Sequence, residues 1–336
     1  MRNILCVTLI ALLGGCTSTS VTEKYQDKRN DIINVKDKVI EFETGNVLIG
    51  SVSRLYMSNK CLLIADHKSV DKQIHIFNKN DFSYLTSIGN FGEGPEEITV
   101  MGCLAIDEAH HQLYVSDHAK QKIFSYDMDS VMVDSLYKPQ VKTAMNETLF
   151  PSEYQYINDT LSIAVLIKPT STSTFNQFLG RWNMNTGEMI PMKYTHPDIQ
   201  KKRITFAASE KAGIYVECYT RHDLMTICSL DGELLYNIYG PDWDGGNGNK
   251  LQSFGTVMIG NDKIFVSYCG EDYARDSFPT KILVFDLEGN YLKTLETGYK
   301  ISDCCYDSFN NRIILSLNDV VQFAYLDTVS YTHLRA

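Results

Sequence analysis

The sequence has no excess of basic residues. Its 336 residues include 31 Lys and Arg against 41 Asp and Glu, which gives a formal net charge of −10. A nucleic-acid or anionic-lipid footprint needs clustered Lys and Arg, so nucleic acid is excluded as the expected partner. The length is sufficient to bury a large core, either as one large all-β domain or as two domains.

Several motifs of catalysis and metal binding are also missing. The chain has no GxSxG element, no P-loop, no HExxH pair and no CxxC spacing. The sequence therefore offers no serine-hydrolase, nucleotide or zinc signature. The stretch Asp242 to Asn249 resembles a calcium loop only superficially, because Gly246 stands where the fifth position needs an oxygen ligand. We expect no catalytic residue, no metal and no cofactor, and we interpret this stretch as a connecting loop.

Long apolar runs are absent apart from one near the start, Ile4 to Leu13, which follows Arg2. Ten positions are too few for a membrane-spanning helix, which needs about 20, so residues 1–15 are interpreted as an export signal. Leu13-Gly14-Gly15-Cys16 resembles a bacterial lipobox. The resemblance implies that Cys16 is the lipidated mature N-terminus; an ordinary signal peptide with an incidental cysteine is the alternative. Residues 16–33 are then expected to form a flexible tether.

Seven cysteines remain outside the leader and the anchor, and an odd number cannot all pair. Cys218 and Cys228 are the first candidates for a disulfide in an exported protein. Buried free thiols on strands are the alternative.

Six short apolar stretches recur with a near-constant period. Their first residues are separated by 51, 48, 53, 50 and 49 positions, which is typical of a repeat architecture. The stretches are Leu62 to Asp66, Leu113 to Asp117, Leu161 to Val165, Ile214 to Cys218, Ile264 to Tyr268 and Ile313 to Leu317.

Each unit reads as a strand, a polar turn, the apolar stretch, a longer polar loop, a third strand, a turn and a fourth strand. Turn residues such as Asp231-Gly232 favour hairpins between the third and fourth strands. A four-stranded meander of about fifty residues exposes both faces, and radial packing around an axis buries them. We therefore predict an all-β, six-bladed β-propeller of four-stranded antiparallel blades over residues 34–328.

The sixth unit ends with its third strand, Val321 to Leu326, and lacks a fourth. A spare strand, Val35 to Thr44, precedes the first unit. We predict that this N-terminal strand completes blade six and closes the ring. The last residues, 329–336, resemble translated adapter read-through and are interpreted as a non-native tail.

The segments Val39 to Thr44, Leu48-Ile49-Gly50 and Ile88 to Glu97 resemble the opening blade of TolB-like six-bladed propeller lipoproteins of Bacteroidota. The resemblance extends over the mature chain and implies the propeller fold and a lipid anchor. It implies little about activity.

The loops after the six apolar stretches are expected on one face, together with the connections between blades, and this face is the predicted binding surface. A histidine metal site there is conceivable, with solvated histidines as the alternative. The candidate residues are His67, His118, Lys168, Tyr219, Arg221, His222, Asp272, Tyr273 and Arg275, with Trp243 at the tip of another loop.

The leading hypothesis is a monomeric, non-catalytic lipoprotein of the outer membrane that binds a protein, peptide or glycan and contacts the membrane only through its lipid. Thr17 after Cys16, rather than a retention aspartate, favours the outer membrane, on its periplasmic or its surface side. The alternative is a lyase or hydrolase of extracellular polymers, which predicts a pocket with at least two perturbed titratable groups. A purely structural envelope component predicts no pocket.

Overall fold

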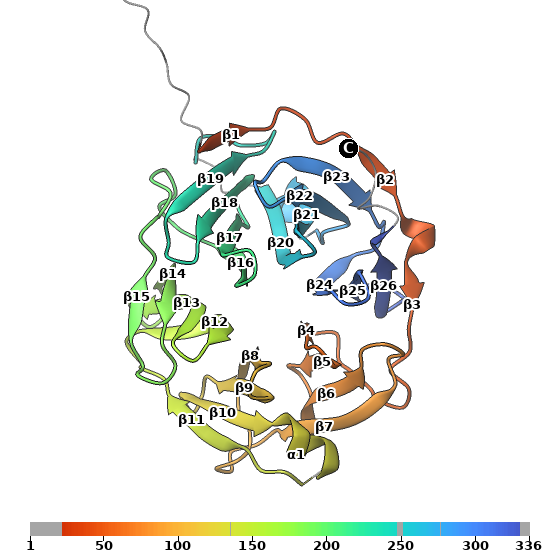
Figure 1. Cartoon of the computed structure of the whole chain (residues 1–336), viewed down its shortest axis with the longest axis vertical. Coiled ribbons are helices and arrows are strands. Elements are labelled where there is room, and N and C mark those ends of the chain that lie inside the picture. The colour runs from red at the N-terminus through yellow and green to blue at the C-terminus, as the bar shows by residue number, and fades with distance from the viewer. Residues whose placement is uncertain (1–21, 135, 247–250, 276, 330–336) are drawn as a thin grey trace, which may run out of the picture.

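The computed structural model describes residues 22–329 apart from 135, 247–250 and 276. Six antiparallel sheets are arranged like blades around a central axis (Figure 1). The described residues add one short helix, α1 (Met128–Val133), and two 3₁₀ turns, η1 (Lys36–Lys38) and η2 (Tyr273–Arg275). The predicted six-bladed all-β propeller is confirmed.

Within each blade the strands follow one another from the axis outwards. Blades one to three hold β4 (Ser53–Met57), β5 (Cys61–Asp66), β6 (Lys72–Asn78) and β7 (Tyr84–Asn90); β8 (Met101–Asp107), β9 (Gln112–Asp117), β10 (Lys122–Asp127) and β11 (Gln140–Ala144); β12 (Phe150–Asn158), β13 (Leu161–Pro169), β14 (Phe175–Trp182) and β15 (Met189–Pro191). Blades four to six hold β16 (Ile204–Ser209), β17 (Ile214–Tyr219), β18 (Leu224–Ser229) and β19 (Leu234–Tyr239); β20 (Leu251–Gly260), β21 (Lys263–Asp272), β22 (Lys281–Asp286) and β23 (Tyr291–Glu296); β24 (Ile301–Asp307), β25 (Arg312–Leu317) and β26 (Phe323–Asp327).

The six recurring apolar stretches are the second strands of the blades. The side chains of Leu62, Leu63 and Ile64 in β5, for example, are fully buried. A second strand is covered on both faces by neighbouring blades, which is why it reads as a continuous apolar run instead of an alternating one. Six apolar clusters result, one at each junction between blades.

The ring is closed by the N-terminal strand, as predicted. The strand β3 (Ile40–Glu41) pairs antiparallel with β26, and the Phe42 N–H donates to the Phe323 carbonyl at 3.1 Å. The Phe42 ring also stacks on Phe82 of blade one, with 3.8 Å between the ring centroids. The closing segment therefore holds blade six and blade one together.

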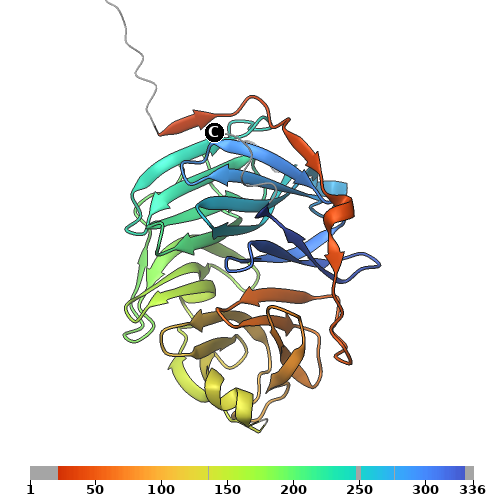
Figure 2. The same cartoon turned by 45° about the vertical axis from the view of Figure 1, so that its right-hand side comes forward.

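The expectation of a flexible tether over residues 16–33 is wrong from Thr22 onwards. The strands β1 (Glu23–Tyr25) and β2 (Ile32–Asn34) pair in parallel with the outer strands β19 and β23. Their backbone N–H and C=O groups pair with the outer edges of β19 and β23, which would otherwise lack hydrogen-bond partners. We call residues 22–34 the strap; it continues into β3, and this red to orange segment borders blades four, five and six (Figures 1 and 2).

Two further findings concern smaller features. In blade two, the connection between the third and fourth strands begins with α1, where the Asp127 carboxylate accepts from the Ser130 N–H at 2.7 Å. The candidate disulfide is absent, because Cys218 faces Met225 and Cys228 faces Tyr215. All seven cysteines of the described chain are buried free thiols, the alternative that the sequence left open.

The signal segment and Cys16 lie outside the described residues, as do residues 330–336 of the tail. Across the part of the chain that the structure describes, no helix is long and apolar enough to cross a membrane.

Candidate functional site

The innermost strands of all six blades surround a central cavity of about 1380 Å³. Figure 1 looks along this axis, with β4, β8, β12, β16, β20 and β24 around the centre. The polar side chains in its lining include Arg54, His67, His118, Glu153 and Asp303. Some of these side chains form hydrogen bonds that connect neighbouring blades, and the others do not.

Asp303 is one of the side chains that connect neighbouring blades. Its carboxylate accepts from the Leu55 N–H at 2.8 Å and from the Thr256 hydroxyl at 2.7 Å, which joins blade six to blades one and five. Burial raises the pKa of Asp303. Thr205 similarly donates to the Gly255 carbonyl at 2.6 Å, between blades four and five. These polar groups are already satisfied inside the protein.

Arg54 and Glu153 form an ion pair inside the cavity. The Arg54 Nη1 lies 2.7 Å from the Glu153 Oε1, and the two side chains are 47% and 38% exposed. Arg54 stands on β4 of blade one and Glu153 on β12 of blade three, so the pair skips blade two. Exposure of both partners leaves donors and acceptors available to a ligand.

His67 contributes a neutral imidazole to the same cavity. Burial lowers its pKa, Arg54 lowers it further, and a hydrogen bond to the Met101 backbone opposes the shift. The His67 Nε2 is buried without a hydrogen-bond partner among the described residues.

His118 is the equivalent residue of the next blade. Burial lowers its pKa, while the carboxylates of Asp117 and Glu153 oppose the shift. Its Nε2 is also buried without a partner among the described residues. The ring lies over Gly102 of β8, where an added Cβ would come 2.5 Å from the Nε2. A larger residue at this position of the inner strand would therefore displace the imidazole.

We call Arg54, His67, His118 and Glu153 the mouth cluster. The two histidines begin the loops that follow second strands, and the connections between blades emerge on the same side. We call this side the mouth face and the opposite side the turn face. The mouth cluster is thus the part of the cavity that combines charge, exposure and unsatisfied nitrogen atoms.

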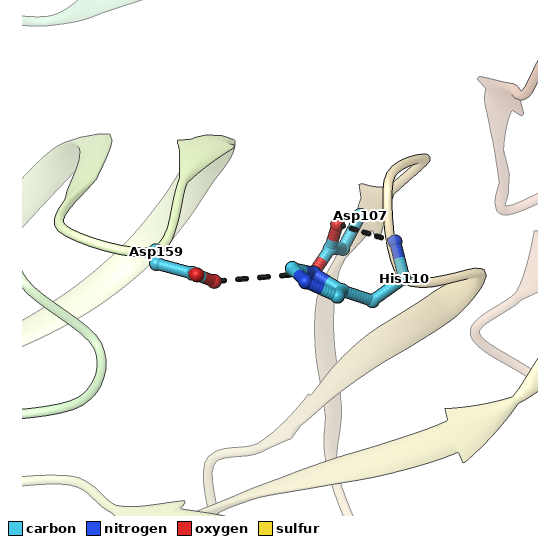
Figure 3. Close-up of side chains that lie close together, drawn as sticks. All are labelled: Asp107, His110 and Asp159. Carbon is cyan, nitrogen blue, oxygen red and sulfur yellow. Dashed lines mark hydrogen bonds and ion pairs between the residues drawn. The ribbon is translucent and has the colours of Figure 1, made fainter.

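The turn face holds a second cluster, Asp107, His110 and Asp159 (Figure 3). One ligand atom from each residue lies within 4.8 Å of the others, which is compatible with a metal ion. The His110 Nδ1 is 2.8 Å from the Asp107 Oδ2 and 3.9 Å from the Asp159 Oδ1. The Tyr156 hydroxyl donates to Asp159 at 2.6 Å.

The same turn recurs in blade six without a histidine. There Asn310 donates to Asp307 through its backbone and its side chain, and it also reaches Asn80 of blade one. A turn that forms equally well with asparagine does not need a metal. The cluster of Figure 3 is therefore explained as a capped turn that contacts the next blade.

Comparison with known proteins supports the architecture. A family model described as DUF5128, 6-bladed beta-propeller, matches residues 17–176. The chain is a six-bladed β-propeller. No curated protein matches it significantly.

Solved structures resemble the propeller at low sequence identity. A Bacteroides fragilis protein named as exported is 14% identical, with a TM-score of 0.57 over 88% of this chain and 87% of that one. A DUF4221 member from Bacteroides vulgatus is 10% identical, with a TM-score of 0.54 over 86% and 94%. The β-propeller domain of Cps50 (Swd1) from Myceliophteria thermophila also has 10% identity and a TM-score of 0.54, over 86% and 99%. Such identities establish the fold alone.

Of the ten residues predicted for a binding surface, the propeller brings His67 and His118 into the cavity lining. Lys168 on β13 is exposed, and so are Asp272 and Arg275 beside η2. Arg275 pairs with Glu271 at 3.0 Å. These exposed residues lie outside the cavity lining. Tyr273 lies in η2, and its side chain is outside what the structure describes.

Three other predicted residues pack inside blade four. Tyr219 is fully buried and donates to Glu217 at 3.1 Å, and His222 is 8% exposed. The Trp243 ring lies against His222 and Tyr239, with centroid distances of 6.1 and 5.0 Å. Trp243 therefore anchors its loop instead of projecting as a stacking surface. Arg221, in the loop before His222, is half-buried.

Arg54 and Glu153 were not predicted. Each is a charged residue inside a first strand that faces the axis, and this is the sequence signal that identifies them. Binding residues usually lie in loops, and these two lie in strands instead.

Proposed function

We propose that the protein is an exported lipoprotein whose propeller binds a protein, peptide or glycan at the mouth face without converting it. One observation carries the proposal: the exposed Arg54–Glu153 ion pair and the rings of His67 and His118 line the same cavity. Polar groups that remain exposed inside a cavity offer hydrogen-bond donors and acceptors to a ligand.

A ligand rich in hydroxyl or amide groups fits this lining. It donates to Glu153, accepts from Arg54 and contacts the rings of His67 and His118. Peptides and glycans both supply donors and acceptors in close succession, so the ion pair does not have to separate on binding. The neutral charge state of both histidines near pH 7 suits such a ligand.

The binding test uses immobilised polysaccharide fragments and a displayed library of random dodecapeptides. The combined variant His67→Ala, His118→Ala is expected to lose affinity for the selected ligand by ~10-fold or more. The matched control is Lys168→Ala, an exposed residue of the same face outside the cavity lining, which is expected to leave affinity unchanged. Equal affinity of the double variant and the wild type would overturn the mouth cluster as the site.

The lipid anchor has its own test. The proposal places acyl chains on Cys16 and the protein at the outer membrane, supported by the lipobox resemblance and by the similarity to an exported protein. Wild-type protein is expected to incorporate labelled palmitate and to fractionate with outer membranes. The Cys16→Ser variant is expected to do neither. A labelled Cys16→Ser variant would refute lipidation at this residue.

A second candidate is a lyase or hydrolase of extracellular polymers. It is favoured by the neutral His67 imidazole, because a neutral imidazole can act as a general base, in a cavity that also holds the Arg54 guanidinium. This function predicts that wild-type protein releases oligosaccharides from a polysaccharide panel and that His67→Gln abolishes the release. A bound polysaccharide recovered intact after prolonged incubation supports the binding function.

A further inference from the structure

The mouth face exposes an unusual group of apolar side chains in the sector of blades six, one and two. We call this group the apolar crescent: Leu48, Val52, Val70, Phe91, Val100 and Val320. Leu48, Val70 and Val320 are 95%, 82% and 99% exposed. Single exposed apolar residues are normal, but a contiguous group is typical of an interaction surface.

Hydrogen bonds hold the loops of the crescent side by side. The Gln322 side chain, close to Val320, donates to the carbonyls of Ile49 and Gly50 at 3.0 and 3.2 Å. The Phe91 N–H donates to the Asp71 carbonyl, next to Val70, at 2.7 Å. The crescent is therefore one surface built from adjoining loops.

Backbone bonds also join the crescent to the mouth cluster. The His67 N–H donates to the Val52 carbonyl at 3.1 Å, and the His118 N–H donates to the Val100 carbonyl at 2.9 Å. Val52, Phe91 and Val100 belong to the cavity lining as well as to the crescent. A ligand that enters the cavity on this side therefore crosses apolar surface first.

The charges around the crescent are mainly acidic. Glu43, Asp71, Glu93 and Asp319 are exposed on the same loops, against two exposed cations, Lys68 and, on the adjoining loop, Lys300. An acidic surround attracts positive charge on a partner and repels negative charge.

We propose that the apolar crescent binds an extended polypeptide segment that carries apolar and basic side chains and leads into the mouth cluster. The inference rests on the proposed binding function and names its ligand class. Five of the six crescent residues are aliphatic, and such side chains match apolar amino acids, whereas sugar rings are better matched by aromatic faces. Backbone amides of the segment supply a donor for Glu153 and an acceptor for Arg54, the exposed members of the mouth cluster.

The test selects random dodecapeptides on detergent-solubilised mature protein. Affinities of the enriched peptides are then measured by fluorescence anisotropy. The crescent variant combines Leu48→Ser, Val70→Ser and Val320→Ser. The matched control combines Val133→Ser, Leu136→Ser and Ile190→Ser, three exposed apolar residues of the outer rim of blades two and three. Both variants remove apolar surface from exposed positions, so both are expected to fold.

Enriched peptides are expected to combine apolar with Lys or Arg residues and to bind the crescent variant ~10-fold or more weakly than the wild type. The rim variant is expected to bind within about 2-fold of the wild type. Failure to enrich any peptide overturns the inference, and so does equal affinity for the crescent variant. If glycans or peptides bind through His67 and His118 regardless of the crescent, the proposed function stands and this inference falls.

Discussion

Arg29 and Asp223 form an ion pair across 194 positions of sequence, with 2.7 Å between Nη1 and Oδ1. The two side chains are only 7% and 0% exposed. The guanidinium also lies over the rings of Phe254, Tyr268 and Phe285, which belong to blade five at its junction with blade four. The pair fastens the strap to the body of the propeller.

Removal of one partner leaves the other charge buried and unpaired. Arg29→Leu is therefore expected to lower the free energy of unfolding by about 3 kcal/mol. Urea titration followed by circular dichroism measures the effect. Lys28→Ala, an exposed neighbour in the strap, is the control and is expected to change little. Indistinguishable unfolding midpoints for Arg29→Leu and the wild type would show that the strap does not contribute to the fold.

Ring closure gives a prediction on a larger scale. Deletion of residues 34–44 removes β3 and the stack of Phe42 on Phe82, so blade six loses its fourth strand and its bond to blade one. We expect the deletion to abolish cooperative thermal unfolding. Phe42→Ala, which keeps the strand, is expected to retain a cooperative but lower transition. A deletion variant that melts like the wild type would contradict the closure.

Gly102 gives a direct test of the geometry around His118. A Cβ at this position would lie 2.5 Å from the His118 Nε2 and 2.9 Å from the Ser116 Cβ. Gly102→Ala is expected to displace the imidazole and to weaken ligand binding by ~10-fold while the protein remains folded. The NMR shift of the His118 ring reports the displacement. An unchanged shift and unchanged affinity would place His118 outside the site.

The turn of Figure 3 predicts a dependence of stability on pH. Hydrogen bonding to Asp107 raises the pKa of His110 above its ordinary value, and the Asp107 and Asp159 charges raise it further. A raised folded pKa contributes stability that is fully present below the unfolded pKa, about 6.5, and is lost as the pH rises through the folded value.

His110→Asn, which copies the turn of blade six, keeps a hydrogen-bond donor without the titration. The melting temperature of the wild type should therefore exceed that of the variant by more at pH 5.5 than at pH 8.5. A difference that is constant over this range, or larger at pH 8.5, would disprove the role of protonated His110. The comparison needs no metal, and melting temperatures that rise with added Zn²⁺ only in the wild type would instead indicate a metal site.

The fold could be predicted because a strand that is buried on both faces has an apolar residue at almost every position. Second strands such as Leu62 to Asp66 must be apolar throughout, so their recurrence gives the number of blades. The missing last strand of blade six likewise identified the closing segment. The strap could not be recognised, since its pairing depends on free edges of β19 and β23 that exist only after the blades have formed.

The site was less accessible to prediction. His67 and His118 could be located because equivalent loops repeat from blade to blade. Arg54 and Glu153 could not be paired, because their contact crosses blade two and depends on the curvature of the ring. Trp243 lies in a loop whose polar composition suggested exposure, but three aromatic neighbours draw its ring into blade four.

The central claim is that ligand binds at the mouth face, and hydrogen exchange of the mature protein with and without a selected ligand tests it most directly. We predict slower exchange in β4, in the connection 91–100 and at the start of β12, with no change in the turns around Asp107 and Asp159. Protection confined to those turns, or to the outer rim, would contradict the account.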